Sequence, residues 1–135
     1  MRSVRGDAVQ VLVSAPAPGV ATRLARALVG PRLAACVQIL GPIRSHYRWQ
    51  GRIESAREWL LLIKTRAALL GAVEAEVRRL HPYTVAEMLV VPVRGGHAPY
   101  LDWLRRECRV RPPATRALTA RTRRRRGRGS SPGSM

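Results

Sequence analysis

Two side chains in this chain are candidates for binding a metal ion. His81 lies where a helical pattern ends, and its neutral imidazole would suit copper. Cys36 lies beside small residues in a strand pattern and would supply a soft thiolate. Both also have a structural interpretation, because a histidine is favourable at a helix C-terminus and a free cysteine commonly packs as a small hydrophobe. With two candidate ligands per chain, we expect no tightly bound cofactor and only weak binding of copper or another divalent cation, unless subunits share the ion.

The motifs of several other kinds of site are missing from the sequence. There is no Cys-x-x-Cys and no histidine pair at i, i+4, which argues against a structural zinc site and a metallochaperone with paired cysteines. A small enzyme of acylphosphatase type, with an arginine phosphate cradle and an asparagine that positions water, is also disfavoured. The chain has no Asn, and the loop at 15–19 has no Arg. We expect a protein that is not an enzyme.

Lys64 is the only lysine, and it lies at the end of an apolar strand pattern. Its ammonium group must find a carboxylate or reach water, and Glu58 and Glu87 are the candidate partners. Tyr47 and Trp49 flank a predicted hairpin. Aromatic residues in such positions anchor protein interfaces or stack on nucleic-acid bases, and the lack of any Phe disfavours the second interpretation.

The spacing of apolar residues predicts the elements that position these side chains. Strands are expected where β-branched and apolar residues run together, at 8–15, 33–40, 43–49, 52–65 and 88–93, with Gly41-Pro42 as a break and Gln50-Gly51 as a tight turn. Helices are expected at 20–29, at 69–80 with Thr65 as the N-cap, and at 100–108 with an apolar stripe of Tyr100, Leu104 and Cys108. The order βαββαβ predicts an α+β, ferredoxin-like sandwich with an added C-terminal helix, both long helices covering one face of an antiparallel sheet.

Charge divides the chain into two parts. Residues 1–108 carry sixteen basic and all eight acidic residues, whereas residues 109–135 carry nine arginines and no acid. We expect a globular domain at 1–108 and a disordered, Arg-rich tail at 109–135 that binds polyanions without sequence preference. No apolar run approaches the roughly 20 residues of a membrane span, so no membrane partner is expected. Two cysteines and no convincing export signal favour reduced thiols in a cytoplasm.

Three predicted strands are apolar on consecutive rather than alternate residues, at 11–13, 59–63 and 89–91. A strand shows successive side chains to opposite faces, so both faces of this sheet need cover. Two long helices cover only one face. Since large exposed apolar patches are rare in monomers, we expect a partner subunit on the other.

Six segments in this order resemble the CutA divalent-cation-tolerance family over about residues 9–106: Leu33-Ala-Ala-Cys-Val37, Tyr47-Arg-Trp-Gln-Gly51, Glu58 with Leu60–Ile63 and Lys64-Thr65, His81-Pro-Tyr83 with Glu87, Pro92-Val93, and Tyr100-Leu-Asp-Trp-Leu104. The resemblance implies a homotrimer whose extended strands pair between subunits, an association with copper and other divalent metals, and no settled enzymatic activity. It also implies a cleft between subunits at Lys64, Tyr83 and Glu87, with Tyr47 and Trp49 nearby. The chain differs from the family pattern at Gln38, where Asn is usual, and at Ala86, where Pro is usual. Val13 and Leu80 stand where some members carry Cys and His, and these two losses thin the set of metal ligands.

The sequence therefore predicts a homotrimeric, cytoplasmic protein of divalent-metal tolerance that binds copper weakly and without turnover. Two alternatives remain. One is a trimeric signalling or regulatory protein that binds a small anion at the subunit interface, although no phosphate-loop motif is present. The other is a nucleic-acid-binding protein that acts through its basic tail.

Overall fold

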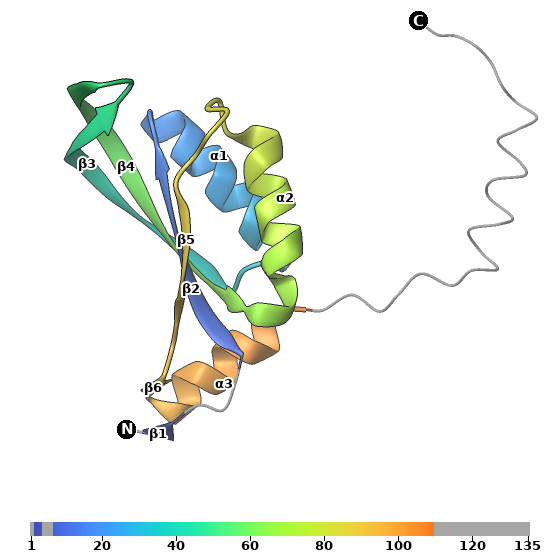
Figure 1. Ribbon diagram of the computed structural model, residues 1–135. Coiled ribbons are helices and arrows are strands. Elements are labelled where there is room, and N and C mark those ends of the chain that lie inside the picture. The colour runs from blue at the N-terminus through green and yellow to red at the C-terminus, as the bar shows by residue number, and fades with distance from the viewer. Residues whose placement is uncertain (1, 4–6, 110–135) are drawn as a thin grey trace, which may run out of the picture.

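The computed structural model describes residues 2–3 and 7–109 (Figure 1). Its elements follow in the order β1 (Arg2–Ser3), β2 (Ala8–Ala15), α1 (Pro18–Val29), β3 (Cys36–Trp49), β4 (Arg52–Arg66), a 3-10 turn (Ala67–Leu69), α2 (Leu70–Leu80), β5 (Met88–Pro92), β6 (Gly95–Gly96) and α3 (Ala98–Glu107). The predicted tail lies outside the described residues apart from Arg109, whose amide donates to the Arg32 carbonyl at 3.1 Å.

The main sheet has the strand order β3-β4-β2-β5, and every neighbouring pair is antiparallel. Helices α1 and α2 lie on the same side of this sheet (Figure 1). This arrangement confirms the predicted α+β, ferredoxin-like sandwich with an added C-terminal helix. A separate two-stranded sheet joins β1 to β6, so the glycines predicted only to break a strand also pair with the N-terminal residues.

The core forms between one face of the sheet and the two long helices. Alternate residues of β2 and β4 point to this helix-covered face, and their side chains are buried: Val9, Val11, Val13, Ala15, Leu61 and Ile63. They meet the apolar stripes of α1 and α2, with Leu24, Leu28, Val73 and Val77 buried. The period of two in the strands and the spacing of three to four in the helices both follow from backbone geometry.

The remaining face of the sheet, which we call the open face, carries the intervening residues of the same strands. Leu12, Leu60 and Leu62 are half-buried there, whereas Leu40, Leu89 and Val91 are exposed. In the part of the chain that the structure describes, no helix covers them. The strands that are apolar on consecutive residues therefore leave an apolar surface that no described part of the chain covers.

The break predicted at Gly41-Pro42 was wrong, because β3 runs through it. The register slips between Leu40 and Ile43, so an irregularity absorbs the proline and the ladder with β4 continues to Trp49. The strand also begins later than predicted. Residues 33–35 instead close the end of α1, where the amides of Leu33 and Ala34 both donate to the Leu28 carbonyl.

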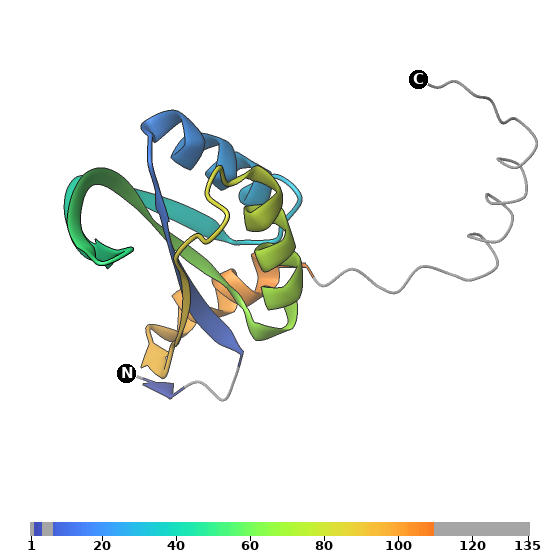
Figure 2. The same cartoon turned by 45° about the horizontal axis from the view of Figure 1, so that its top comes forward.

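The hairpin that joins β3 and β4 projects from the sheet and curls into an arc at one side of the molecule (Figure 2). Its turn is Gln50-Gly51, as predicted, and both residues have positive φ angles of 49° and 78°. Two consecutive positive φ angles are the signature of a type I′ turn, whose twist matches that of the flanking strands.

Two further predictions at the ends of elements were wrong. Thr65 does not cap a helix: it is a fully buried strand residue whose hydroxyl donates to the Leu33 carbonyl at 2.7 Å. The 3-10 turn before α2 begins without a side-chain cap. The buried stripe of α3 is Leu101, Leu104 and Cys108, and Tyr100 lies beside it on the exposed side.

Candidate functional site

His81 is held at the C-terminal end of α2 by hydrogen bonds to both of its ring nitrogens. Pro82 disfavours helical backbone at the preceding residue, so His81 turns to an extended conformation and the helix ends. Its Nε2 lies 2.7 Å from the Ser14 carbonyl oxygen, and the Tyr83 amide donates to its Nδ1 at 3.1 Å. A carbonyl only accepts and an amide N–H only donates, so the ring is the neutral tautomer with its proton on Nε2. Neither nitrogen has a lone pair left for a metal ion in this conformation.

Tyr83, Tyr47 and Glu58 lie around this histidine. The Tyr83 ring packs 5.1 Å from the imidazole, centroid to centroid. Burial raises the pKa of Tyr83, and the nearby Glu58 carboxylate and Tyr47 add to the effect. The Glu58 side chain comes from β4 and is buried, so the hairpin base and the loop after α2 meet at an aromatic, carboxylate-containing corner. The structure thus brings together His81, Tyr83 and Tyr47 from the set predicted by sequence.

Cys36 and Lys64 form a second group on the open face. They are directly opposite one another in the β3–β4 ladder. The Cys36 Sγ lies 3.8 Å from the Tyr100 hydroxyl, and Lys64 donates to the Gln38 side-chain oxygen. Burial raises the pKa of Tyr100 to about 12, and Cys36 adds to the shift. The Cys36–Tyr100 contact joins residues 64 positions apart, so no local pattern in the sequence could have indicated it.

These two groups are separate within one chain. His81 bonds to Ser14, which pairs with Leu60, whereas Cys36 pairs with Lys64, four residues further along β4. At about 3.4 Å per strand residue, that offset alone is about 14 Å, far more than one ion can bridge. Among the residues that the structure describes, no three His, Cys, Asp or Glu side chains converge as around a metal ion.

The partners predicted for Lys64 do not contact it within the chain. Glu58 lies six residues away on the same strand. Glu87 precedes β5, near the Ser14 end of β2, whereas Lys64 pairs with Gln10 at the opposite end. Trp49 lies apart from both groups at the hairpin turn, with 51% of its surface exposed. The predicted cleft residues therefore occupy three separate places on one subunit.

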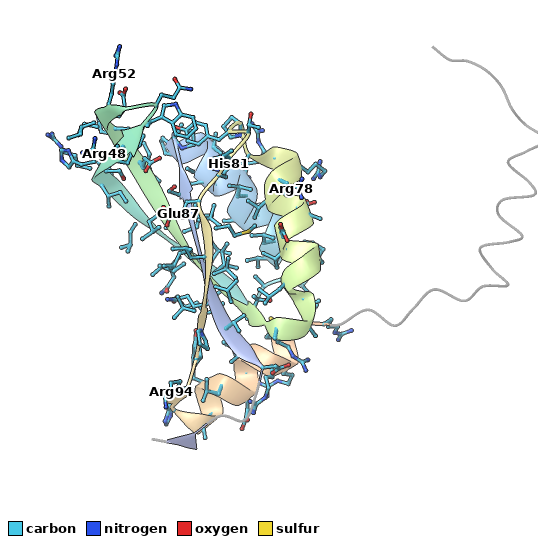
Figure 3. All side chains as sticks on the ribbon, in the orientation of Figure 1. Arg48, Arg52, Arg78, His81, Glu87 and Arg94 are labelled. Atoms are coloured by element: carbon cyan, nitrogen blue, oxygen red, sulfur yellow. The ribbon has the colours of Figure 1, made fainter. Side chains whose placement is uncertain are left out.

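The carboxylates divide into paired and unpaired sets. Five of the eight form ion pairs with arginines: Asp7, Glu74, Glu76, Asp102 and Glu107. Within residues 7–109, the structure records no ion pair for Glu54, Glu58 or Glu87. These three lie on the hairpin and before β5, and Figure 3 shows Glu87 and His81 along the loop that leads into that strand. They are the oxygen ligands that the chain has available for a cation.

The strand order, the two helices on one face of the sheet and the uncovered other face together define the class, a small α+β protein with a ferredoxin-like fold. The family model of the CutA1 divalent ion tolerance protein matches residues 9–107, and the chain belongs to this family. CutA1 is a family of divalent ion tolerance proteins and not of enzymes.

Individual relatives agree with this assignment. The chain is 46% identical over 95 residues to the divalent-cation tolerance protein CutA of Thermus thermophilus, a match that covers 70% of this chain and 92% of the relative. It is 45% identical over 102 residues to human protein CutA, where the match covers 76% of this chain and 57% of the relative. The crystal structure of CutA1 from Oryza sativa superposes with a TM-score of 0.75 at 38% identity, covering 77% of this chain and 95% of that one.

The names of relatives refer to different compartments, since one from Archaeoglobus fulgidus is called periplasmic and one from rice chloroplastic. Of the helices in the described part of this chain, none has the length and apolar character needed to cross a membrane.

Proposed function

We propose that this protein is a homotrimer that binds divalent cations, copper among them, weakly and without turnover, and so contributes to metal tolerance in the cytoplasm. The observation that carries the assembly is the open face. Leu40, Leu89 and Val91 are exposed side by side with half-buried leucines, and a second copy of the chain is the cover that their apolar character favours. Membership of the CutA1 family supports the same conclusion.

Weak metal binding follows from the state of the candidate ligands. An ion at His81 must displace the hydrogen bond from the Tyr83 amide or the one to Ser14, and this loss is subtracted from the binding free energy. Cys36 offers a soft thiolate, but among the described residues it belongs to no group of three His, Cys, Asp or Glu side chains that could hold an ion. Assembly would bring further groups to such a site, with Glu87, Tyr83, Tyr47, Trp49 and Lys64 as the lining of a cleft between subunits.

Calorimetric titration of the full chain tests the metal, and light scattering coupled to gel filtration tests the assembly. We expect a mass of three times 15.0 kDa and affinities in the order copper, then zinc, then manganese. His81→Gln and Cys36→Ser should each weaken copper binding. His97→Gln, at an exposed histidine outside both groups, is the matched control. Equal copper binding by all four proteins would show that the copper site lies elsewhere. A monomer at micromolar concentration would exclude the trimer.

A further inference from the structure

The open face is charged at its two ends and apolar between them. Lys64 lies near one end of β4, and Glu58 lies six residues earlier on the same strand. Because successive side chains of a strand alternate between the two faces, Glu58 shares the open face with Lys64. Leu60 and Leu62 lie between the two charges on this face. At about 3.4 Å per strand residue, the two charged side chains are anchored about 20 Å apart.

Lys64 carries a positive charge that no described acid of its own chain neutralises. Its ammonium group donates to the Gln38 side-chain oxygen, and no ion pair is recorded for it among residues 7–109. Its neighbours across the two ladders, Cys36 and Gln10, bear no carboxylate. A second copy that covered the open face would remove this half-buried ammonium group from water, which is costly unless a carboxylate meets it there.

Glu58 has the opposite requirement. Only 8% of its surface is exposed, yet no ion pair or hydrogen bond is recorded for its carboxylate in the described part of the chain. Every fully buried side-chain oxygen in that part has a hydrogen-bond partner, so the Glu58 oxygens still reach solvent through a small opening. No group of three possible metal ligands forms there, whereas an ammonium group needs only one carboxylate.

We propose that, in the homotrimer proposed above, Lys64 of one subunit forms an ion pair with Glu58 of the partner subunit. The pair presupposes that trimer and adds the residues that set the register of its subunits. The cation and the carboxylate lie at opposite ends of one face. Each subunit therefore gives its lysine to one neighbour and its glutamate to the other, which is the head-to-tail arrangement of a closed ring.

The same register bears on the proposed metal site. Cys36 is directly opposite Lys64 in the β3–β4 ladder, so the two side chains approach the neighbouring subunit together. His81 packs against Tyr83, which lies beside Glu58. The ion pair therefore brings Cys36 and His81 of different subunits towards one another, although the two residues are far apart within one chain.

A double-mutant cycle on the full chain tests the ion pair. Lys64→Met and Glu58→Gln remove one charge each and nearly keep the shape of the side chain. Within one chain the two residues are too far apart to interact, and substitutions more than about 10 Å apart have additive effects on stability. Coupling between the two changes therefore reports a contact between subunits. Guanidinium denaturation at several protein concentrations measures the stability of the trimer, because assembly makes stability depend on concentration.

We expect each single variant to lower the denaturation midpoint, because it leaves an uncompensated charge at the interface. Each broken contact should weaken association by about a hundredfold or more. The double variant should be no less stable than the less stable single variant. Lys64→Met combined with Glu87→Gln is the matched control. Glu87 is an exposed carboxylate without a recorded ion pair in the described residues, and this combination should show no coupling.

Charge reversal gives an independent measurement. Lys64→Glu and Glu58→Lys should each weaken assembly, and an equimolar mixture of the two, refolded together, should assemble better than either variant alone. A mixture that assembles no better than its components would overturn the proposal.

Two results of the cycle would also overturn it: additive losses in an intact trimer, or coupling of Lys64 to Glu87 in place of Glu58. A monomeric unaltered chain would instead contradict the proposed trimer itself, so light scattering on that chain separates the two failures.

Discussion

At the scale of single residues, the side chains chosen by sequence were chemically distinctive, but their partners were distant in the chain. His81 was identifiable because it precedes a proline at a helix end. The Ser14 carbonyl that accepts from it lies 67 residues away, and the Tyr83 amide donates only because the backbone turns there. The Cys36–Tyr100 contact depends on where α3 packs, which no strand pattern encodes. Residue types therefore indicated the candidates, while the tertiary fold determined which of their atoms remain free.

Tyr100 gives a prediction about alkaline pH. Burial, with Cys36 as the second cause, raises its pKa to about 12, whereas the pKa of a tyrosine in an unfolded chain is about 10. The folded state binds more protons between these values, so this contribution to stability is complete below about pH 10 and is lost as pH rises towards 12.

Urea denaturation from about pH 9 to pH 11.5 measures the effect. We expect the free energy of unfolding to fall less steeply with pH in Tyr100→Phe than in the unaltered chain. Cys36→Ala should move the ultraviolet titration of Tyr100 only part of the way back. Identical pH slopes in the unaltered chain and Tyr100→Phe would show that Tyr100 is not the group responsible.

At the scale of elements, the order of strands and helices was predictable and their ends were not. Periodicity located all four main strands and all three helices. The hydrogen bonds that decide the ends are between distant segments. The Thr65 hydroxyl, for example, donates to the Leu33 carbonyl and does not cap a helix. Local sequence rules predict that the strand breaks at Gly41-Pro42, yet pairing with β4 resumes past the register shift.

The close approach at Gly41 gives a prediction for the hairpin. A methyl group there would overlap the Cγ and Cδ1 atoms of the Trp59 indole. Because the ring is rigid, Gly41→Ala should displace it and destabilise the protein by about 1–3 kcal/mol. Chemical denaturation followed by tryptophan fluorescence reports both effects.

Gly71→Ala is the matched control, since no atom lies within 4 Å of the added group and the site is helical. It should stabilise α2 by up to about 1 kcal/mol. If Gly41→Ala were as stable as this control, the packing of Trp59 against the bulge would not constrain the hairpin.

At the scale of the whole molecule, the uncovered sheet face was predictable and the separation of the chemical groups was not. Consecutive apolar residues in three strands indicated an apolar surface on both sides, and the open face confirms it. The sequence could not show that His81 and Cys36 lie at opposite ends of the β2–β4 ladder, because strand register sets that distance. A metal site that uses both His81 and Cys36 would therefore have to combine residues of different subunits.

Leu89→Asp tests the role of the open face in assembly. Leu89 is 56% exposed in the single chain and lies among the apolar residues of this face, so a carboxylate there would be buried by a partner without compensation. We expect the mass measured by light scattering to fall towards that of one chain. Val85→Asp, at a loop residue that is 72% exposed, should leave the mass unchanged. A trimer that survives the change at Leu89 would place the interface on another surface.

The position of β2 has a consequence for how the chain folds. This strand precedes the other long elements that the structure describes, yet it lies in the interior of the sheet between β4 and β5. Its residues pair with partners about fifty and eighty positions later, so both of its edges stay unsatisfied until most of the chain has been synthesised. Such long-range closure makes folding slow and exposes an apolar strand during translation. The chain can therefore complete its core only after β5 has emerged.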